Sequence, residues 1–184
     1  HAASTKPVVS AFIGGSVALA LVRELAPSLT ALMVAGRVGS SITTELGTMR
    51  VTEQIDALET MAVDPLHYLV SPRILACLLL MPMLTIGFNA VGLFGSYAVC
   101  TGMLGIDKAM FFSRIYTWIT PSDIWCSIVK GIAFGGVVGS IACYKGYFAS
   151  GGSRGVGKAT TATVVTSSVT VLVVDYVITT MWMR

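Results

Sequence analysis

RELAPSLTALMVAGRVGSSITTELGTMRVTEQIDALETMAVDPLHYLVSPR, residues 23–73, is the stretch that decides the fold. It contains an apolar segment, a short charged segment and the beginning of a second apolar segment. Five of the chain's nine acidic residues lie within its residues 45–64: Glu45, Glu53, Asp56, Glu59 and Asp64. The sequence on either side is almost uncharged. Two membrane-compatible segments joined by a compact acidic one predict a membrane protein that presents a binding element to the water phase.

The composition of the whole chain supports this interpretation. The chain is 54% hydrophobic and 11% charged, and its mean hydropathy is +0.80. Soluble domains carry about 25% charged residues, and an apolar stretch of about 20 residues is enough to cross a bilayer as a helix. Strand-like alternation over ten-residue blocks, typical of outer-membrane barrels, is absent. We therefore predict an all-α integral membrane protein with several spans.

Four spans are expected within one transmembrane domain over residues 1–184, at about residues 8–43, 74–99, 124–144 and 160–182. The first would be about 54 Å long as one helix, which exceeds the hydrocarbon core of about 30 Å. One end should therefore project, or the helix should break near Pro27. Pro82 predicts a kink in the second span, and residues 102–123 and 151–158 are expected to be loops.

The distribution of basic residues predicts the orientation. The segment 145–159 contains Lys145, Arg154 and Lys158 and no acid, so it should be cytoplasmic. Counting spans backward places the acidic segment at 44–73 on the same side and residues 102–123 outside. The chain begins at His1 rather than Met, and we expect that its natural N-terminus, with a further span, precedes it.

A short amphipathic helix is predicted over residues 52–62. Ile55, Leu58 and Met61 recur at helical spacing, opposite the three acidic residues of this segment. Asp64-Pro65 should end the helix, and Ser71-Pro72 should begin the next. Thr120-Pro121 is the start signal of a later helix. One interpretation is an interfacial helix lying on the membrane. Such helices favour Lys and Arg, so docking of the acidic face into a basic protein groove fits better.

Arg23 and Glu24 are the most informative charges within the apolar stretch. Ionisable residues in a span are costly and usually face a cavity, a partner or each other. They could pair with each other or extend to the interface, as Arg37 could, or they could line a polar translocation pathway. Gly131, Gly135 and Gly139 form a small-residue stripe that permits close helix approach, either inside one subunit or at a homodimer seam.

Several other functions are excluded by the residues present. Residues 152–159, GSRGVGKA, nearly match a phosphate-binding loop, but Ala159 stands where a hydroxyl must hold Mg²⁺. The only histidines, His1 and His67, lie outside the spans, so no intramembrane Ser–His pair is possible, and neither a metal-ligand cluster nor a catalytic site is predicted. The four cysteines are isolated in apolar surroundings, and the net charge of +3 gives no indication of nucleic-acid binding.

Long motifs in this chain resemble those of the MlaE permease family, and the resemblance covers essentially the whole sequence. The motifs are RELAP (23–27), AGRVGS (35–40), ELGTMR (45–50), TEQ (52–54), MAVDP (61–65), SPR (71–73) and ATTATVV (159–165), with Ser167-Ser168 and Asp175. From the family pattern we expect that an N-terminal interfacial helix and a first span precede this sequence.

The resemblance implies the membrane subunit of an ABC transporter that moves phospholipid between the inner and outer membranes of Gram-negative bacteria. Family members in the inner membrane act as homodimers with two cytoplasmic ABC ATPases, a STAS-domain protein and a periplasmic MCE-domain hexamer. ATP and Mg would be bound by the ATPase, so this chain itself would carry no cofactor and no enzymatic activity.

The resemblance also assigns roles to residues by position. Arg23, Glu24 and Leu25 fall where the family's lipid pocket is lined. The residues implied in ATPase coupling are Glu45, Arg50, Glu53, Gln54, Asp56, Leu58, Glu59 and Met61. The alternative is a stand-alone secondary transporter or channel, which would need ion-coupling residues in the spans. Beyond Arg23, Glu24, Lys130 and Asp175, few are present.

Overall fold

The computed structural model describes residues 16–102 and 108–182, and within these ranges every regular element is a helix. The elements are η1 (Leu21–Leu25), α2 (Ala26–Val34), η2 (Ala35–Gly39), α3 (Ser40–Val51), α4 (Gln54–Thr60), η3 (Leu66–Val70), α5 (Ser71–Gly102), α6 (Lys108–Trp118), α7 (Pro121–Tyr147) and α8 (Gly152–Trp182), where η marks a π-helical turn. The all-α prediction is confirmed.

Four continuous helices in the described ranges are long and apolar enough to cross a membrane. They cover Ser16–Val51, Leu66–Gly102, Pro121–Tyr147 and Gly152–Trp182. With 27 to 37 residues each, they are about 40–55 Å long and extend beyond the ranges expected from sequence. Residues 8–15 of the first expected span lie outside the described residues.

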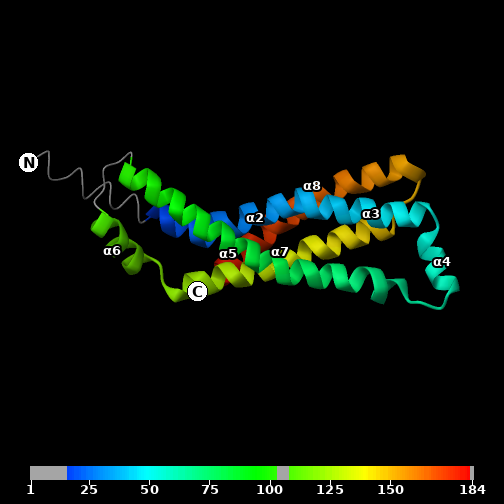
Figure 1. The fold of residues 1–184 in the computed structure, drawn as a ribbon, viewed down its shortest axis with the longest axis horizontal. Helices are drawn as coiled ribbons and strands as arrows, with labels where there is room; N and C mark the ends of the chain where they lie inside the picture. Colours follow the sequence, from blue (N-terminus) through cyan, green and yellow to red (C-terminus); the bar gives the residue numbers. More distant parts are fainter. Residues whose placement is uncertain (1–15, 103–107, 183–184) are drawn as a thin grey trace, which may run out of the picture.

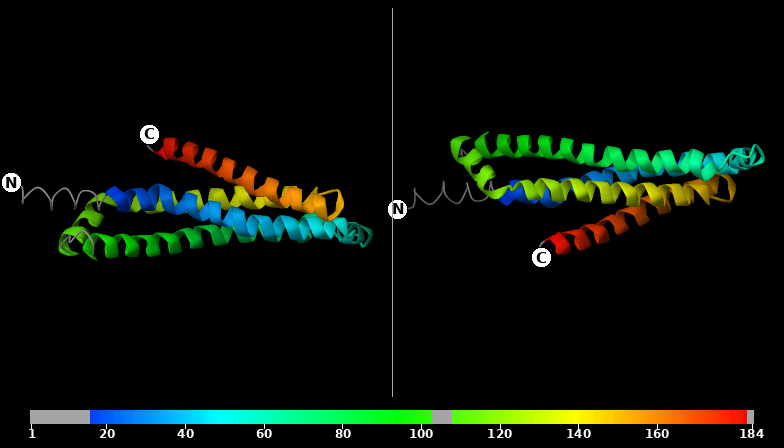
Figure 2. Two further views of the ribbon diagram at one scale, coloured as in Figure 1. Left: turned by 90° about the horizontal axis from the view of Figure 1, so that it is seen from above. Right: turned by 90° about the horizontal axis from the view of Figure 1, so that it is seen from below.

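The long helices form an elongated bundle with a short helix at each end (Figure 1). α4 caps one end and α6 lies at the other. α7 packs against α5, α8 and α3, so it is the central helix of the bundle. α8 starts beside α3 and α7 and diverges from the other helices toward its C-terminal end (Figure 2).

The first long helix does not break at Pro27, contrary to one of the two expectations for it. A π-helical turn, η1, precedes this proline, and the Ala26 N–H bonds to the Leu21 carbonyl five residues back. η3 precedes Pro72 in the same way, with the Ser71 N–H bonded to Leu66. Because a wide turn relieves the clash between a proline ring and the preceding turn, the helices continue through both prolines.

The predicted helix start at Ser71-Pro72 is therefore wrong, since the helix already begins at Leu66 after Pro65. The predicted start at Thr120-Pro121 is confirmed. Thr120 and Asp123 form a reciprocal capping box, with the Thr120 N–H donating to Asp123 at 3.0 Å and the Thr120 hydroxyl at 2.7 Å. A capping box satisfies the free N–H groups at a helix start.

Both expected loops contain helix. Residues 102–123 include α6, and residues 151–158 include the first turns of α8. The reversal between α7 and α8 is confined to residues 148–151, because Gly151 and Gly152 adopt φ angles of +90° and +68°. Left-handed φ is readily available only to glycine, so two adjacent glycines allow a short turn and leave the following residues free to form a helix.

The glycine stripe of α7 packs inside the chain, against α5. A Cβ added at Gly135 would lie 2.6 Å from the Cys77 carbonyl oxygen, and one at Gly131 would lie 3.1 Å from the Pro82 Cα. A Cβ added at Gly139 would lie 3.2 Å from the Cys77 Cβ. The internal-packing interpretation of this stripe is therefore correct. It also explains how α5 remains a single helix through Pro82, since α7 covers the helix at that point.

The end of the bundle that carries α4 is predicted to be cytoplasmic, which cysteine labelling can test. In the full-length protein with its native cysteines replaced, Ser153→Cys in the first turn of α8 should resist a membrane-impermeant thiol reagent in intact cells. Ser113→Cys in α6 should react once the outer membrane is permeabilised, because both side chains are exposed. The reverse labelling pattern would invert the assigned orientation.

Candidate functional site

A fully buried lysine lies at the centre of the candidate site. The Lys130 side chain, on α7, has no exposed surface. Its Nζ lies 2.8 Å from Glu24 Oε2 on η1 and 2.9 Å from Asp175 Oδ1 on α8, and it donates to the Arg23 carbonyl oxygen at 3.1 Å. We call Lys130, Glu24 and Asp175 the ionic cluster. It connects three spanning helices near the end of the bundle that carries α6.

Pro27 explains why the Arg23 carbonyl is available to the lysine. In an α-helix this oxygen would accept the N–H of residue 27, and proline has none. The Lys130 ammonium takes the place of that donor. Pro27 thus accounts for both the π-helical turn and a free carbonyl acceptor. The buried Lys130 ammonium needs such an acceptor, because each donor of a buried cation must be hydrogen-bonded.

Thr179, one turn after Asp175 on α8, completes the polar shell. Its hydroxyl lies 2.8 Å from the Asp175 carbonyl oxygen and 3.3 Å from each carboxylate oxygen of Glu24. The carboxylates of Glu24 and Asp175 share one cation, the Lys130 ammonium. Removing one partner from a buried ion pair typically costs about 3–5 kcal/mol, so the cluster fixes the relative heights of η1, α7 and α8.

Arg23 pairs with a different acid, so the alternative in which Arg23 and Glu24 pair with each other is wrong. Arg23 Nη1 lies 3.8 Å from Asp123 Oδ1, and Asp123 also closes the capping box of α7. Consecutive residues on a helix point in different directions and do not face each other. Glu24 therefore neutralises Lys130, while Arg23 reaches the start of α7.

Leu25 lies on another face of the same turn. Its side chain is 47% exposed, and Leu29 and Met33 continue the exposed apolar stripe along α2. The structure thus brings Arg23 and Glu24 into polar networks and leaves Leu25 on an open apolar surface. An amphiphile passing this turn would meet both chemistries within one helical turn.

Sequence reasoning did not assign a role to several residues of this region. Asp123 and Thr179 were absent from the predicted site. Lys130 appeared only as a charge that an ion-coupled transporter would need, and Asp175 as such a charge and as part of the family resemblance. The Asn89 side chain on α5 donates a hydrogen bond to the Ser127 hydroxyl on α7 at 3.0 Å. Ser127 lies three residues before Lys130. The signal that could have found Lys130 and Asp175 is an ionisable residue in the middle of a span.

At the opposite end, α4 is seated on the bundle as its amphipathic pattern predicts. Ile55 is fully buried, and Leu58 packs against the same core cluster, which includes Leu46, Leu69 and Ala142. The helix is shorter than predicted, covering Gln54–Thr60 rather than 52–62. Met61 is 71% exposed, so it does not join the buried face.

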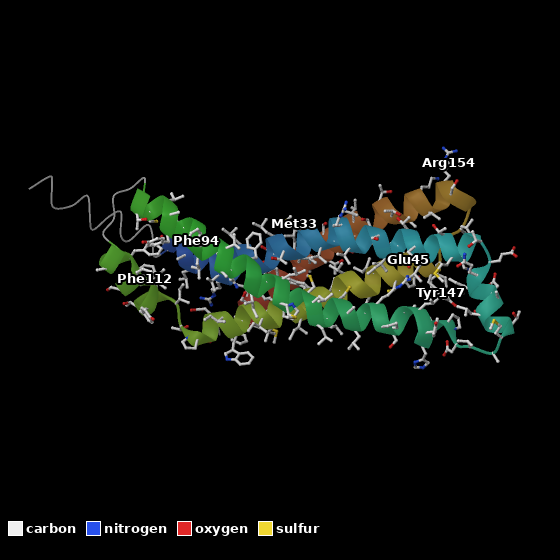
Figure 3. All side chains as sticks on the ribbon, in the orientation of Figure 1. Met33, Glu45, Phe94, Phe112, Tyr147 and Arg154 are labelled. Atoms are coloured by element: carbon white, nitrogen blue, oxygen red, sulfur yellow. The ribbon has the colours of Figure 1, made fainter. Side chains whose placement is uncertain are left out.

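The acids near α4 are partly neutralised within the chain. Asp56 accepts from Arg50 at 2.5 Å, and Glu45 pairs with Arg73 at 3.0 Å. The Tyr147 hydroxyl lies 3.5 Å from Glu59, and Figure 3 shows Glu45 and Tyr147 at the α4 end.

Two further residues implied in ATPase coupling face the water phase. Glu53 and Gln54 are exposed, and Glu53 adopts a φ of +59° as the residue before α4. The water-facing surface is therefore a mixture of acidic and basic groups.

A family model described as Permease MlaE matches residues 2–181. The chain belongs to the MlaE permease family. It is a multi-pass membrane protein, as its four long apolar helices also show. The motif resemblance noted in the sequence is thereby confirmed over nearly the whole chain.

Individual relatives agree with this family. The chain is 44% identical to a probable ABC transporter permease protein of Rickettsia conorii, over 91% of this chain and 65% of the relative. It is 42% identical to the intermembrane phospholipid transport system permease protein MlaE of Haemophilus influenzae, over 91% and 64%. The chloroplastic protein TRIGALACTOSYLDIACYLGLYCEROL 1 of Arabidopsis thaliana is 38% identical over 94% of this chain and 49% of its own length. The chain thus spans slightly less than two thirds of these bacterial permeases.

Replacing the buried lysine should destabilise the fold strongly. Lys130→Met should lower the free energy of unfolding by about 3–5 kcal/mol, because two carboxylates would lose their shared cation. Lys158→Met, on the exposed side of α8, is the matched control and should be near neutral. Thermal unfolding of the detergent-purified full-length protein measures both, and equal melting temperatures would contradict a structural role for the ionic cluster.

Proposed function

We propose that this protein is the membrane permease subunit of an ABC transporter that moves phospholipid between the inner and outer membranes of a Gram-negative bacterium. It would reside in the inner membrane as a homodimer, with two cytoplasmic ATPases, a STAS-domain protein and a periplasmic MCE-domain hexamer. ATP and Mg would bind to the ATPase, and this chain would supply the lipid path. The name of the Haemophilus relative supports the lipid substrate.

The observation that carries this proposal is the seating of α4. A seven-residue amphipathic helix buries Ile55 completely in the bundle and leaves Glu53, Gln54 and Glu59 exposed. It directly follows the long helix Ser16–Val51, which carries Arg23 and Glu24 at its other end. A movement imposed on α4 by an ATPase would therefore reach the ionic cluster through one continuous helix.

The other end of that helix suits a phospholipid. Arg23 could hold a phosphate with its planar fork of donors, and Leu25 offers an exposed apolar surface to the acyl chains. Glu24 holds Lys130, so it would act by positioning rather than by binding the headgroup. Opening a path between η1 and α8 would require the contacts of Glu24 and Asp175 with Lys130 to separate or to shift.

The ionic cluster also favours a second candidate, an ion-coupled secondary transporter. Ionisable residues buried in spans mark ion pathways and proton relays. The two functions differ in their energy source. An ABC permease copurifies with an ATPase and loses transport when ATP is withheld, whereas a secondary transporter loses transport when the proton gradient is collapsed.

Charge reversal on α4 should release the ATPase. The triple substitution Glu53→Lys, Asp56→Lys and Glu59→Lys should abolish copurification, while each single neutralisation is mild, because exposed ion pairs contribute about 0–1 kcal/mol each. The matched control replaces the same residues by Gln, Asn and Gln. Gel filtration should show the permease still folded in both variants. Intact copurification after the triple reversal would exclude α4 as the docking element.

Substitutions at η1 should reduce the lipid bound to the protein. Arg23→Ala should weaken binding by about tenfold or more, since a hydrogen bond to a charged group contributes about 1.5–3 kcal/mol. Arg23→Lys should retain part of the binding, and Leu25→Asp should lose more by placing a charge among the acyl chains. The measurements are phospholipid copurified per dimer and resistance of cells to SDS with EDTA. Wild-type values in both Arg23→Ala and Leu25→Asp would contradict a lipid site here.

A further inference from the structure

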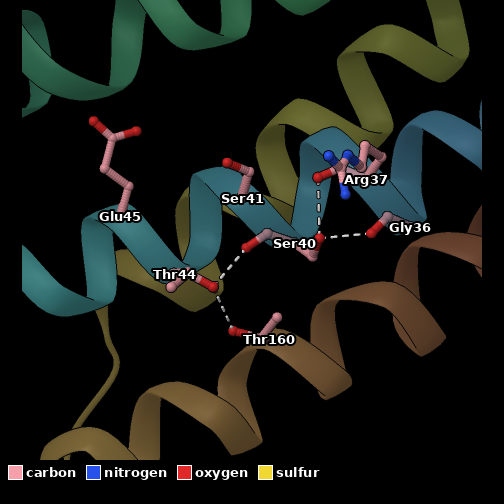
Figure 4. Close-up of a pocket in the computed structure, with 7 residues that line it drawn as sticks. All are labelled: Gly36, Arg37, Ser40, Ser41, Thr44, Glu45 and Thr160. Carbon is pink, nitrogen blue, oxygen red and sulfur yellow. Dashed lines mark hydrogen bonds between the residues drawn. The ribbon is translucent and has the colours of Figure 1, made fainter.

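Two hollows of the bundle meet at Arg37. The first is an apolar groove of about 570 Å³ between α2–η2 and α5, lined chiefly by Met33, Val38, Met83, Leu84 and Phe88. The second is a polar hollow of about 590 Å³ between α3 and α8, lined by Ser40, Ser41, Thr44, Glu45 and Thr160 (Figure 4). Arg37 lines both. An apolar groove that opens beside a cation and a row of hydroxyls is complementary to an amphiphile with an anionic head.

Arg37 is free to bind such a head. Its side chain is exposed, and its guanidinium makes no hydrogen bond or ion pair with any residue in the described ranges. The guanidinium groups of Arg23, Arg50 and Arg73 are each paired with an acid. Glu45, the one acid in the polar hollow, lies 3.0 Å from Arg73, so its charge is neutralised by another residue. A guanidinium with all of its donors open is suited to bidentate binding of phosphate.

The position of Arg37 along the bundle fits a headgroup at the bilayer surface. It lies about 20 Å along the helix from Glu24 and about 12 Å from Glu45. A long basic side chain at this depth extends toward the interface while its stem remains in apolar surroundings. The groove runs from Arg37 toward the ionic cluster as far as Thr30 and Val91, about 12 Å further along α5 and α2. The groove therefore follows the direction of an acyl chain.

We propose that these hollows form a phospholipid site, with the phosphate on Arg37 and one acyl chain in the groove. The site lies in the half of the membrane nearer α4 and is separate from Arg23, Glu24 and Leu25. The proposed function concerns transport and a lipid site at η1, whereas this proposal concerns lipid binding at Arg37. It holds whether or not the transporter moves the lipid bound at Arg37. Its test can therefore fail while the lipid site at η1 stands.

The chain provides substitutions that separate this site from ordinary lipid contact. A Cβ added at Gly87, which lines the groove, meets nothing within 4 Å, and the same is true of Gly95, two turns further along α5 and outside the groove. Gly87→Leu should therefore fill the groove without disturbing the fold, and Gly95→Leu is its matched control. Arg37→Ala removes the cation, and Arg37→Lys keeps the charge but loses the bidentate fork.

The experiment places the full-length complex in nanodiscs of phosphatidylethanolamine and phosphatidylglycerol. A phospholipid with a diazirine in its acyl chain is photolysed, and the labelled residues are mapped by mass spectrometry. A diacylglycerol with the same diazirine but no phosphate is the reference probe. The phospholipid should label residues 83–91 more than the diacylglycerol does. Arg37→Ala should lower this labelling by about tenfold, Arg37→Lys by less, and Gly87→Leu should abolish it, with Gly95→Leu unchanged.

Three results would overturn the proposal. Equal labelling by the two probes, or unchanged labelling in Arg37→Ala, would show that the labelled lipid belongs to the surrounding bilayer and is not bound by Arg37. Absence of labelling in the wild-type complex would show that a protein segment fills the groove. The lipid copurification assay on Arg23→Ala is independent of all three, so loss of bound lipid there together with any of these results would reject this site alone.

Discussion

The burial of one ammonium group constrains the rest of the structure. The Lys130 side chain has no exposed surface, and a buried charge is tolerated only when it is paired and hydrogen-bonded. Glu24 and Asp175 must therefore come to the same height as the lysine from two other helices. This requirement fixes η1 and α8 against α7. The glycines on another face of α7 then bring α5 close, because a Cβ added at Gly135 would lie only 2.6 Å from the Cys77 carbonyl oxygen.

Irregular helical turns lie where these interactions are made. The π-helical turn before Pro27 accompanies a carbonyl that the helix cannot satisfy, and the buried lysine donates to it. A residue that weakens a helix locally thus contributes to contact between helices. The same first helix carries Arg37 in its second π-helical turn and continues to α4. One long helix therefore connects polar groups at two heights of the bundle with α4 at its end, which suits transmission between the ends of the bundle.

Hydropathy and local signals predicted a large part of this architecture. The scarcity of charge over four long apolar stretches determines the helical membrane class, because only hydrogen-bonded helices or closed barrels satisfy the backbone in lipid. The helix start at Thr120-Pro121 and the burial of Ile55 were predicted from local sequence alone. The loop predictions for residues 102–123 and 151–158 were wrong, because α6 and the start of α8 are helical there. Low hydropathy and glycine content indicate a polar segment or a turn, but they do not exclude a polar helix.

The sequence by itself determined which charges lie in the membrane, since Arg23, Glu24, Lys130 and Asp175 interrupt apolar stretches. Only the tertiary structure decided how they pair. Arg23 forms an ion pair with Asp123, and Glu24 accepts a hydrogen bond from Lys130, 106 positions away, because adjacent helical residues point in different directions. Whether the glycine stripe faces another helix of the same chain or a second copy also depends on helix rotation. Periodicity places residues on a face of a helix, but the identity of the element opposite that face is set by packing.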